Sequence, residues 1–202
     1  MVIGFVGLPG SGKTYYVTKL ALDDIKKGIK VYSNFYIVGA TMYDDLETVL
    51  TSIEKEITLE QGSFVASGKP FYDFKPTKTT VIIDEINLVC PARFWDTFNP
   101  KLAYFWSQSR KLGLNLYWTA QHQDRVDKIV REITNYIWKV KTFYFGYHLA
   151  SLYDIIKIDS QKAISLERKL FRIYKDVYQN YDTFFRIALP KRIDKAFYKK
   201  RW

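Results

Sequence analysis

The apolar residues of the first 141 positions follow two alternating patterns. Short stretches rich in β-branched, aromatic and other apolar residues predict strands at residues 2–6, 29–38, 79–83, 114–119 and 136–141. Between these stretches, apolar residues recur every three or four positions, which predicts helices from Lys13 to Gly28 and at 44–59, 101–112 and 124–134. Residues 61–78 hold two glycines and two prolines and are predicted to be a loop. Strands alternating with helices predict an α/β fold: a mostly parallel sheet with helices on both faces.

The last third of the chain is less regular. Only residues 164–178 show helix-like spacing, around Leu170, Phe171 and Tyr174. We therefore divide the chain into a core over residues 1–141 and a basic, aromatic extension over residues 142–202 that packs on the core.

A phosphate-binding loop follows the first predicted strand. Residues 7–14 are GLPGSGKT, with glycines where the backbone turns tightly enough to point successive N–H groups at one anion. Lys13 would bridge the terminal phosphates of ATP, and the Thr14 hydroxyl would bind Mg²⁺. A glycine-rich turn with an incidental lysine is the alternative. The predicted nucleotide-binding residues are Gly7, Leu8, Pro9, Gly10, Ser11, Gly12, Lys13, Thr14 and Tyr15.

Two adjacent carboxylates, Asp84 and Glu85, end the predicted strand 79–83. Ligands of open α/β sheets bind at the carboxyl ends of strands, so both side chains are expected near the phosphate loop. Asp84 would then hold Mg²⁺, and Glu85 would accept a proton from the water that attacks the γ-phosphate. In isolation, two acids after a strand would more simply form a solvated turn.

Gln121 and three arginines are further candidates. Gln121 follows the strand 114–119, where it could sense the γ-phosphate or orient the attacking water; a plain loop glutamine is the rival interpretation. Arg110, Arg125 and Arg131 flank this strand. We expect Arg110 near the rim of the site, where it would stabilise transition-state charge on a neighbouring subunit's nucleotide.

Charge is concentrated near the end of the chain. The net charge is +10, of which residues 136–202 supply +9, because they hold 15 Lys and Arg against 6 Asp and Glu. Sixteen aromatic residues accompany these cations. Cations for the backbone and rings for the bases suit nucleic acid, whereas a solvated basic face with the rings in the core is the alternative. The single cysteine, Cys90, leaves no disulfide framework or cysteine-rich metal site and fits a reducing compartment.

Three stretches together resemble a known family: GLPGSGKT, then TTVIIDEINLVCPAR, then FWSQSRKLGLNLYWTAQH. They resemble the zonular occludens toxin-like branch of the FtsK/HerA ATPases, which includes filamentous-phage assembly ATPases and is related to viral genome-packaging ATPases. The resemblance covers residues 1–141. It implies a RecA/FtsK-HerA-like P-loop fold, a hexameric ring around DNA, and the roles already given to Lys13, Thr14, Asp84, Glu85 and Gln121.

These features together predict an ATP-driven DNA translocase for genome packaging or virion assembly, acting on double-stranded DNA in the host cytoplasm or with the virion. A viral capsid or membrane assembly partner is expected as well. Proteins of the resembled branch usually continue into a membrane span, for which this sequence has no apolar run of sufficient length. A soluble motor, or a chain lacking its membrane part, is therefore expected. The alternatives are a small-molecule P-loop kinase and a nucleotide-gated assembly factor.

Overall fold

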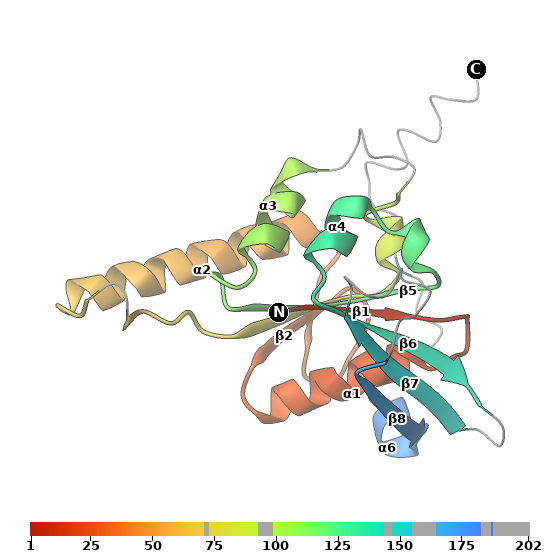
Figure 1. Ribbon diagram of the computed structural model, residues 1–202. Helices are drawn as coiled ribbons and strands as arrows, with labels where there is room; N and C mark the ends of the chain where they lie inside the picture. The colour runs from red at the N-terminus through yellow and green to blue at the C-terminus, as the bar shows by residue number, and fades with distance from the viewer. Residues whose placement is uncertain (71–72, 93–98, 144–146, 155–164, 183–186, 188–202) are drawn as a thin grey trace.

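One eight-stranded sheet organises the chain in the computed structural model, with the order β3-β2-β4-β5-β1-β6-β7-β8 (Figure 1). The structure describes residues 1–70, 73–92, 99–143, 147–154, 165–182 and 187. All pairs from β3 to β6 are parallel, whereas β6–β7 and β7–β8 are antiparallel. The strands are β1 (Val2–Val6), β2 (Lys30–Ser33), β3 (Thr41–Met42), β4 (Thr79–Ile83), β5 (Leu114–Ala120), β6 (Tyr136–Thr142), β7 (Tyr147–Asp154) and β8 (Glu167–Arg172).

Helices cover both faces of the sheet, as the alternating pattern predicts (Figure 1). On one face lie α1 (Lys13–Lys26) and the short α6 (Lys175–Tyr178), and on the other lie α2 (Leu46–Ala66), α3 (Pro100–Gln108) and α4 (Lys128–Ile133). Local signals fix where two of them start. Asp45 caps α2 by accepting a hydrogen bond from the backbone N–H of Thr48, and Asn99 caps α3 immediately before Pro100.

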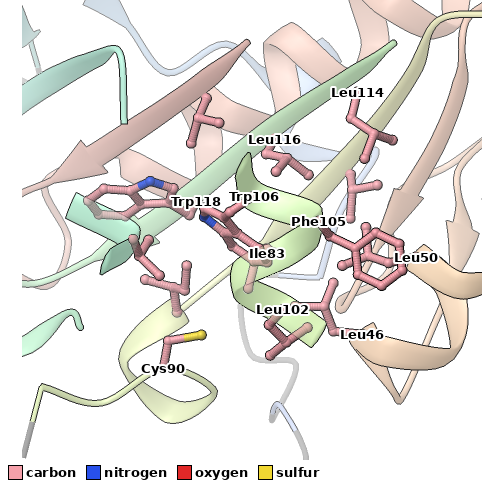
Figure 2. Packing of buried hydrophobic residues seen from close by; sticks show 14 of the residues in the cluster. Leu46, Leu50, Ile83, Cys90, Leu102, Phe105, Trp106, Leu114, Leu116 and Trp118 are labelled. Carbon is pink, nitrogen blue, oxygen red and sulfur yellow. The ribbon is translucent and has the colours of Figure 1, made fainter. Parts of the chain in front are cut away.

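Each face of the sheet has its own hydrophobic core. Trp106 of α3 and Trp118 of β5 are fully buried in the core beneath α2, α3 and α4 (Figure 2). Trp118 lies so close to β1 that a Cβ on Gly4 would come within 2.2 Å of its ring, so only glycine fits there. On the α1 face, Phe5 packs at 5.7 Å between ring centroids from Tyr16. The two cores hold the parallel strands in register and thereby fix the positions of their carboxyl ends.

Five predicted elements differ from the structure. The helix predicted at 124–134 starts only at Lys128, because residues Gln123–Arg125 form a separate 3₁₀ turn. The predicted loop 61–78 is wrong over its first part, because α2 continues to Ala66: one internal glycine, Gly62, costs only about 1 kcal/mol in a helix. The strand predicted at 29–38 ends at Ser33, whose hydroxyl accepts the N–H of Phe35 as the chain turns. The helix predicted at 101–112 ends at Gln108, before Gly113 (φ 60°) turns the chain into β5.

The helix predicted at 164–178 is also wrong where the structure describes it. Residues Glu167–Arg172 form the edge strand β8, and only Lys175–Tyr178 are helical. The apolar residues Leu170 and Tyr174 have helical spacing, but the side chains of β8 alternate between the two faces of the sheet. Strand β6 continues through residue 141 and pairs with β7 of the predicted extension, so both parts contribute to one sheet. The division into 1–141 and 142–202 remains a prediction.

Candidate active site

The phosphate loop connects β1 to α1 at the carboxyl edge of the parallel strands. The N–H of Gly7 donates to the carbonyl oxygen of Ala120 at 3.3 Å, which joins the start of the loop to the end of β5. Gly10 and Gly12 have positive φ angles of 73° and 92°, a conformation that favours glycine. The N-cap residue of α1 is Gly12, which has no side chain to accept hydrogen bonds from the first turn of the helix. The first N–H groups of α1 therefore have no helical acceptor and can bind an anion.

Lys13 begins the helix and is almost completely buried, with 6% of its surface exposed. Its Nζ donates to the carbonyl oxygen of Leu8 at 3.2 Å, so the side chain folds back along the loop. Burial lowers the pKa of Lys13, while the carboxylates of Glu85 and Asp84 act in the opposite direction. An ammonium group is thus held beside the loop and faces two acids.

Asp84 connects three elements through one carboxylate oxygen. Its Oδ1 accepts the hydroxyl of Thr119 at 2.6 Å and the hydroxyl of Thr14 at 3.3 Å. Its backbone is held by Asn34, which accepts the N–H of Asp84 at 2.8 Å and donates to its carbonyl oxygen at 3.0 Å. Burial raises the pKa of Asp84, and the hydrogen bonds from Thr119 and Thr14 and the charge of Lys13 lower it. The end of β4 is therefore fixed against both the loop and β5.

Glu85 lies in the left-handed region, with φ 50° and ψ 55°. It is the one non-glycine residue with a positive φ in the described part of the chain. Such a conformation costs about 1–3 kcal/mol and is concentrated at functional sites. Its N–H donates to the Thr119 hydroxyl at 3.0 Å, which fixes the turn. Burial and the adjacent Asp84 raise the pKa of Glu85, a direction that suits a general base.

Gln121 leaves the end of β5 beside the loop. Its Oε1 accepts a hydrogen bond from Arg125 Nη1 at 3.2 Å. Arg125 also lowers the pKa of Glu85 electrostatically, so Gln121, Arg125 and Glu85 belong to one neighbourhood. Arg125 therefore orients the side-chain amide of Gln121, and the sensor role of Gln121 stays a prediction.

The expectation that Arg110 lies at the rim of this site is wrong. Arg110 precedes β5, and the N-terminal ammonium of Met1 donates to Leu114 at the same end of the sheet. Gln121 follows the opposite end of the strand. At about 3.3 Å per residue, seven residues of β5 separate the two ends by roughly 20 Å. Arg110 is distant from its own phosphate loop, and its action on a neighbouring subunit stays a prediction.

The antiparallel strands also reach the phosphate loop. His148 of β7, 5% exposed, has its Nδ1 2.8 Å from the carbonyl oxygen of Ser11, which assigns the proton to Nδ1 as donor. The hydroxyl of Thr142 donates to the carbonyl oxygen of Gly10 at 3.3 Å. A Cβ on Gly12 would lie 3.2 Å from His148 Nδ1, so the imidazole packs directly against the loop.

Phe171 of β8 completes this contact. Its ring stacks on His148 at 5.3 Å and on Tyr15 at 5.7 Å between centroids. The hydroxyl of Tyr15 accepts the N–H of Tyr174 at 3.3 Å. The side chain of Tyr15 therefore packs against β8, which leaves only its backbone for the predicted contact with nucleotide.

The family of the chain follows from comparison with known proteins. Residues 1–184 match the family described as Zonular occludens toxin (Zot). The chain belongs to this family. No curated protein matched the sequence. Among the described residues of this Zot-family chain, no helix combines the length and apolarity needed to cross a membrane.

Solved structures share the fold. The N-terminal domain of zonular occludens toxin from Neisseria meningitidis is 20% identical over 90% of this chain and 98% of that chain, with a TM-score of 0.58. The genome packaging NTPase B204 from Sulfolobus turreted icosahedral virus 2, in complex with ATP-gammaS, is 15% identical over 86% and 97%, with a TM-score of 0.53. EssC (ATPases 2 and 3) from Geobacillus thermodenitrificans is 13% identical over 98% and 43%, with a TM-score of 0.55. The Zot-family chain therefore has the P-loop ATPase fold.

Three residues that hold the site in place, Asn34, Thr119 and His148, were not predicted from the sequence pattern. Thr119 stands two positions before Gln121, and Asn34 directly follows β2; both could have been found as polar residues at the ends of neighbouring strands. His148 has no such local signal, since it contacts Ser11 from 137 positions away. The contact depends on a strand pairing that the apolar pattern of residues 142–202 does not reveal.

Proposed function

We propose that this Zot-family protein hydrolyses ATP and uses the energy to move DNA. One observation carries the ATPase part: Thr14 of the loop and Thr119 of β5 both donate to Asp84, which places Lys13, Asp84 and Glu85 around one point. A merely structural turn would not require two half-buried acids beside a buried lysine, because desolvating charges is costly. The arrangement matches what phosphoryl transfer requires.

The roles follow from the chemistry of each group. The N–H groups of the first turn of α1 and the ammonium of Lys13 would bind the phosphates of ATP. A hydroxyl and a carboxylate are ligands that Mg²⁺ prefers, so Thr14 and Asp84 would hold this ion, directly or through water. When bound, Mg²⁺ neutralises charge on the phosphates. Glu85, with its raised pKa, would take the proton of the attacking water, and Gln121 would orient that water.

Movement of DNA is the finer part of the proposal. It is supported by the 15 Lys and Arg among residues 136–202 and by the fold shared with the genome packaging NTPase B204. In this proposal the chain assembles into a ring, as a hexamer, around double-stranded DNA. The work would serve virus assembly or genome packaging.

The test measures the ATPase rate of the purified protein alone, with double-stranded DNA, with single-stranded DNA and with nucleosides. We expect Mg²⁺-dependent hydrolysis that duplex DNA stimulates. Hydrolysis without stimulation by either DNA would contradict the translocase while keeping the ATPase. Phosphorylation of a nucleoside would assign a kinase instead, and nucleotide binding without turnover would assign a nucleotide-gated assembly factor.

A further inference from the structure

The strands β6, β7 and β8 have two faces of different character. Side chains alternate across a strand, and the pairing of His148 with Phe171 and of Trp138 with Leu152 places these residues on the α1 face. The opposite face, here called the outer face, carries four cations and two tyrosines: Lys139, Lys141, Arg168, Arg172, Tyr147 and Tyr153. The described outward positions of these strands include no acidic residue. The strands project past α4 (Figure 1), so the described helices leave much of this face uncovered.

The cations of the outer face are organised by rings rather than by carboxylates. Lys139 Nζ lies 5.1 Å from the ring centroid of Tyr153, and the guanidinium of Arg172 lies 4.5 Å from that of Tyr147. Within the described residues, none of the four cations forms an ion pair. On the α1 face of β8, by contrast, the ammonium of Lys169 forms an ion pair with the carboxylate of Glu167 at 3.1 Å. Among the residues that the structure describes, the cations of the outer face therefore have no carboxylate partner, whereas Lys169 on the other face has one.

We infer that the outer face of β6–β8 binds the phosphate backbone of double-stranded DNA. This inference rests on the proposed function and adds the surface that contacts the DNA. Planar guanidinium groups bind phosphate oxygens through two hydrogen bonds, and neighbouring lysines add charge. Three strands about 4.8 Å apart form a strip roughly 10 Å across, which suits one backbone of a duplex.

The environment of the two tyrosine rings on the outer face favours duplex over single-stranded DNA. Platforms for single strands stack bases on free aromatic rings. Here Tyr147 and Tyr153 are half-buried and each already lies beneath a cation, so neither ring is open for stacking. The outer face therefore offers charge to phosphates and little to bases, which favours the duplex.

An anionic membrane surface fits this face less well. Elements that lie on membranes insert an apolar face into the headgroup boundary. Among the outward residues of β7 and β8, Leu170 is 62% exposed, whereas Leu149 is half-buried. One exposed leucine is a small anchor beside four cations.

The experiment compares two double variants of the full-length protein that remove the same charge from opposite sides. Arg168→Gln with Arg172→Gln changes the outer face. The matched control, Lys169→Gln with Lys175→Gln, changes β8 and α6 on the α1 side. Binding to duplex DNA is measured from 50 to 200 mM salt. Each lost phosphate contact lowers the slope of log K against log salt by about 0.9, so the outer-face variant should lose about 2 in slope and the control almost nothing.

A charge-conserving variant, Arg168→Lys with Arg172→Lys, separates the loss of charge from misfolding. It changes the same two residues but keeps their charge, so it should retain most of the salt slope. Equal losses in the outer-face variant and the control would overturn the surface but not the function, provided that DNA still stimulates the parent ATPase. No DNA binding by the parent protein would overturn both. Tighter binding of single strands, or binding only to anionic vesicles, through these arginines would overturn the assignment to duplex DNA.

Discussion

The parallel and antiparallel parts of the sheet contribute to the phosphate loop in different ways. The parallel strands β1, β4 and β5 deliver functional groups beyond their carboxyl ends: Asp84 and Gln121 directly follow β4 and β5, and Lys13 follows the loop that leaves β1. The antiparallel strands instead contribute residues that lie within the strands: His148 of β7 contacts the loop, and Phe171 of β8 stacks on His148. The parallel part carries the proposed chemistry, whereas the antiparallel part supports the loop from behind and presents charge on its outer face. Separate substitutions can test whether these two contributions are distinct.

Lys13→Ala should give the largest effect, in the parallel part. It removes a buried cation that would pair with the phosphates of ATP. Truncating one partner of a buried, hydrogen-bonded charge pair costs about 2–5 kcal/mol. ATP affinity should therefore fall on the order of a hundredfold or more, measured by calorimetry with a non-hydrolysable analogue. The exposed Lys19→Ala on the same helix is the control, with unchanged affinity expected. Parent-like affinity in Lys13→Ala would remove the phosphate-binding role.

The difference between the two parts also explains what the sequence could reveal. A parallel strand buried on both faces is a run of apolar residues, and its functional residue comes next in the chain, so Asp84 and Glu85 were predictable. Strand β8 is an edge strand with exposed cations, and its apolar residues happen to match helical spacing. The contact of His148 with Ser11 depends on tertiary pairing alone. Asn34 and Thr119 were less predictable than Asp84 and more predictable than His148. They lie at the carboxyl ends of strands, but their polar side chains are common at such positions.

Arg125→Ala should give the next largest effect. Arg125 holds Gln121 and lies within electrostatic reach of Glu85, and a hydrogen bond from a charged group contributes about 1.5–3 kcal/mol. We expect kcat to fall about ten- to a hundredfold with little change in ATP affinity. Arg110→Ala is the matched change at the opposite edge of the sheet and should leave the ATPase of the isolated chain unchanged. A loss in Arg110→Ala that appears only when the chains assemble would indicate contact with a neighbouring subunit.

His148→Leu tests the contribution of the antiparallel part. The change leaves the buried carbonyl of Ser11 without its donor, which costs about 1–3 kcal/mol, and loosens the loop behind Gly12. ATP affinity should weaken about tenfold, seen as a raised KM at nearly constant kcat. His148→Asn places an amide donor near the position of Nδ1 and should restore most of the affinity. Equal behaviour of the two variants would mean that the hydrogen bond does not position the loop.

Asp84→Asn should give the smallest effect, a gain in stability of the nucleotide-free protein. Burial raises the pKa of Asp84, so over the pH range between its ordinary and raised values the folded state binds more protons than the unfolded state. The contribution of Asp84 to stability therefore decreases as pH rises through this range. Thermal melts at pH 7.5 should show Asp84→Asn more stable by about 0.5–2 kcal/mol, with a smaller advantage at pH 4. The exposed Asp44→Asn is the control; a destabilised Asp84→Asn would mean that the carboxylate is needed for folding.

In the proposed mechanism, Glu85 at the end of β4 activates water for ATP hydrolysis. The most direct test measures ATP affinity and single-turnover hydrolysis in the parent and in Glu85→Gln, which keeps the size of the side chain and removes the base. We predict affinity within about threefold of the parent and a hydrolysis rate lower by about a hundredfold or more, the usual contribution of a general base. Hydrolysis by Glu85→Gln at the parent rate would contradict the assignment of Glu85 and the mechanism built on it.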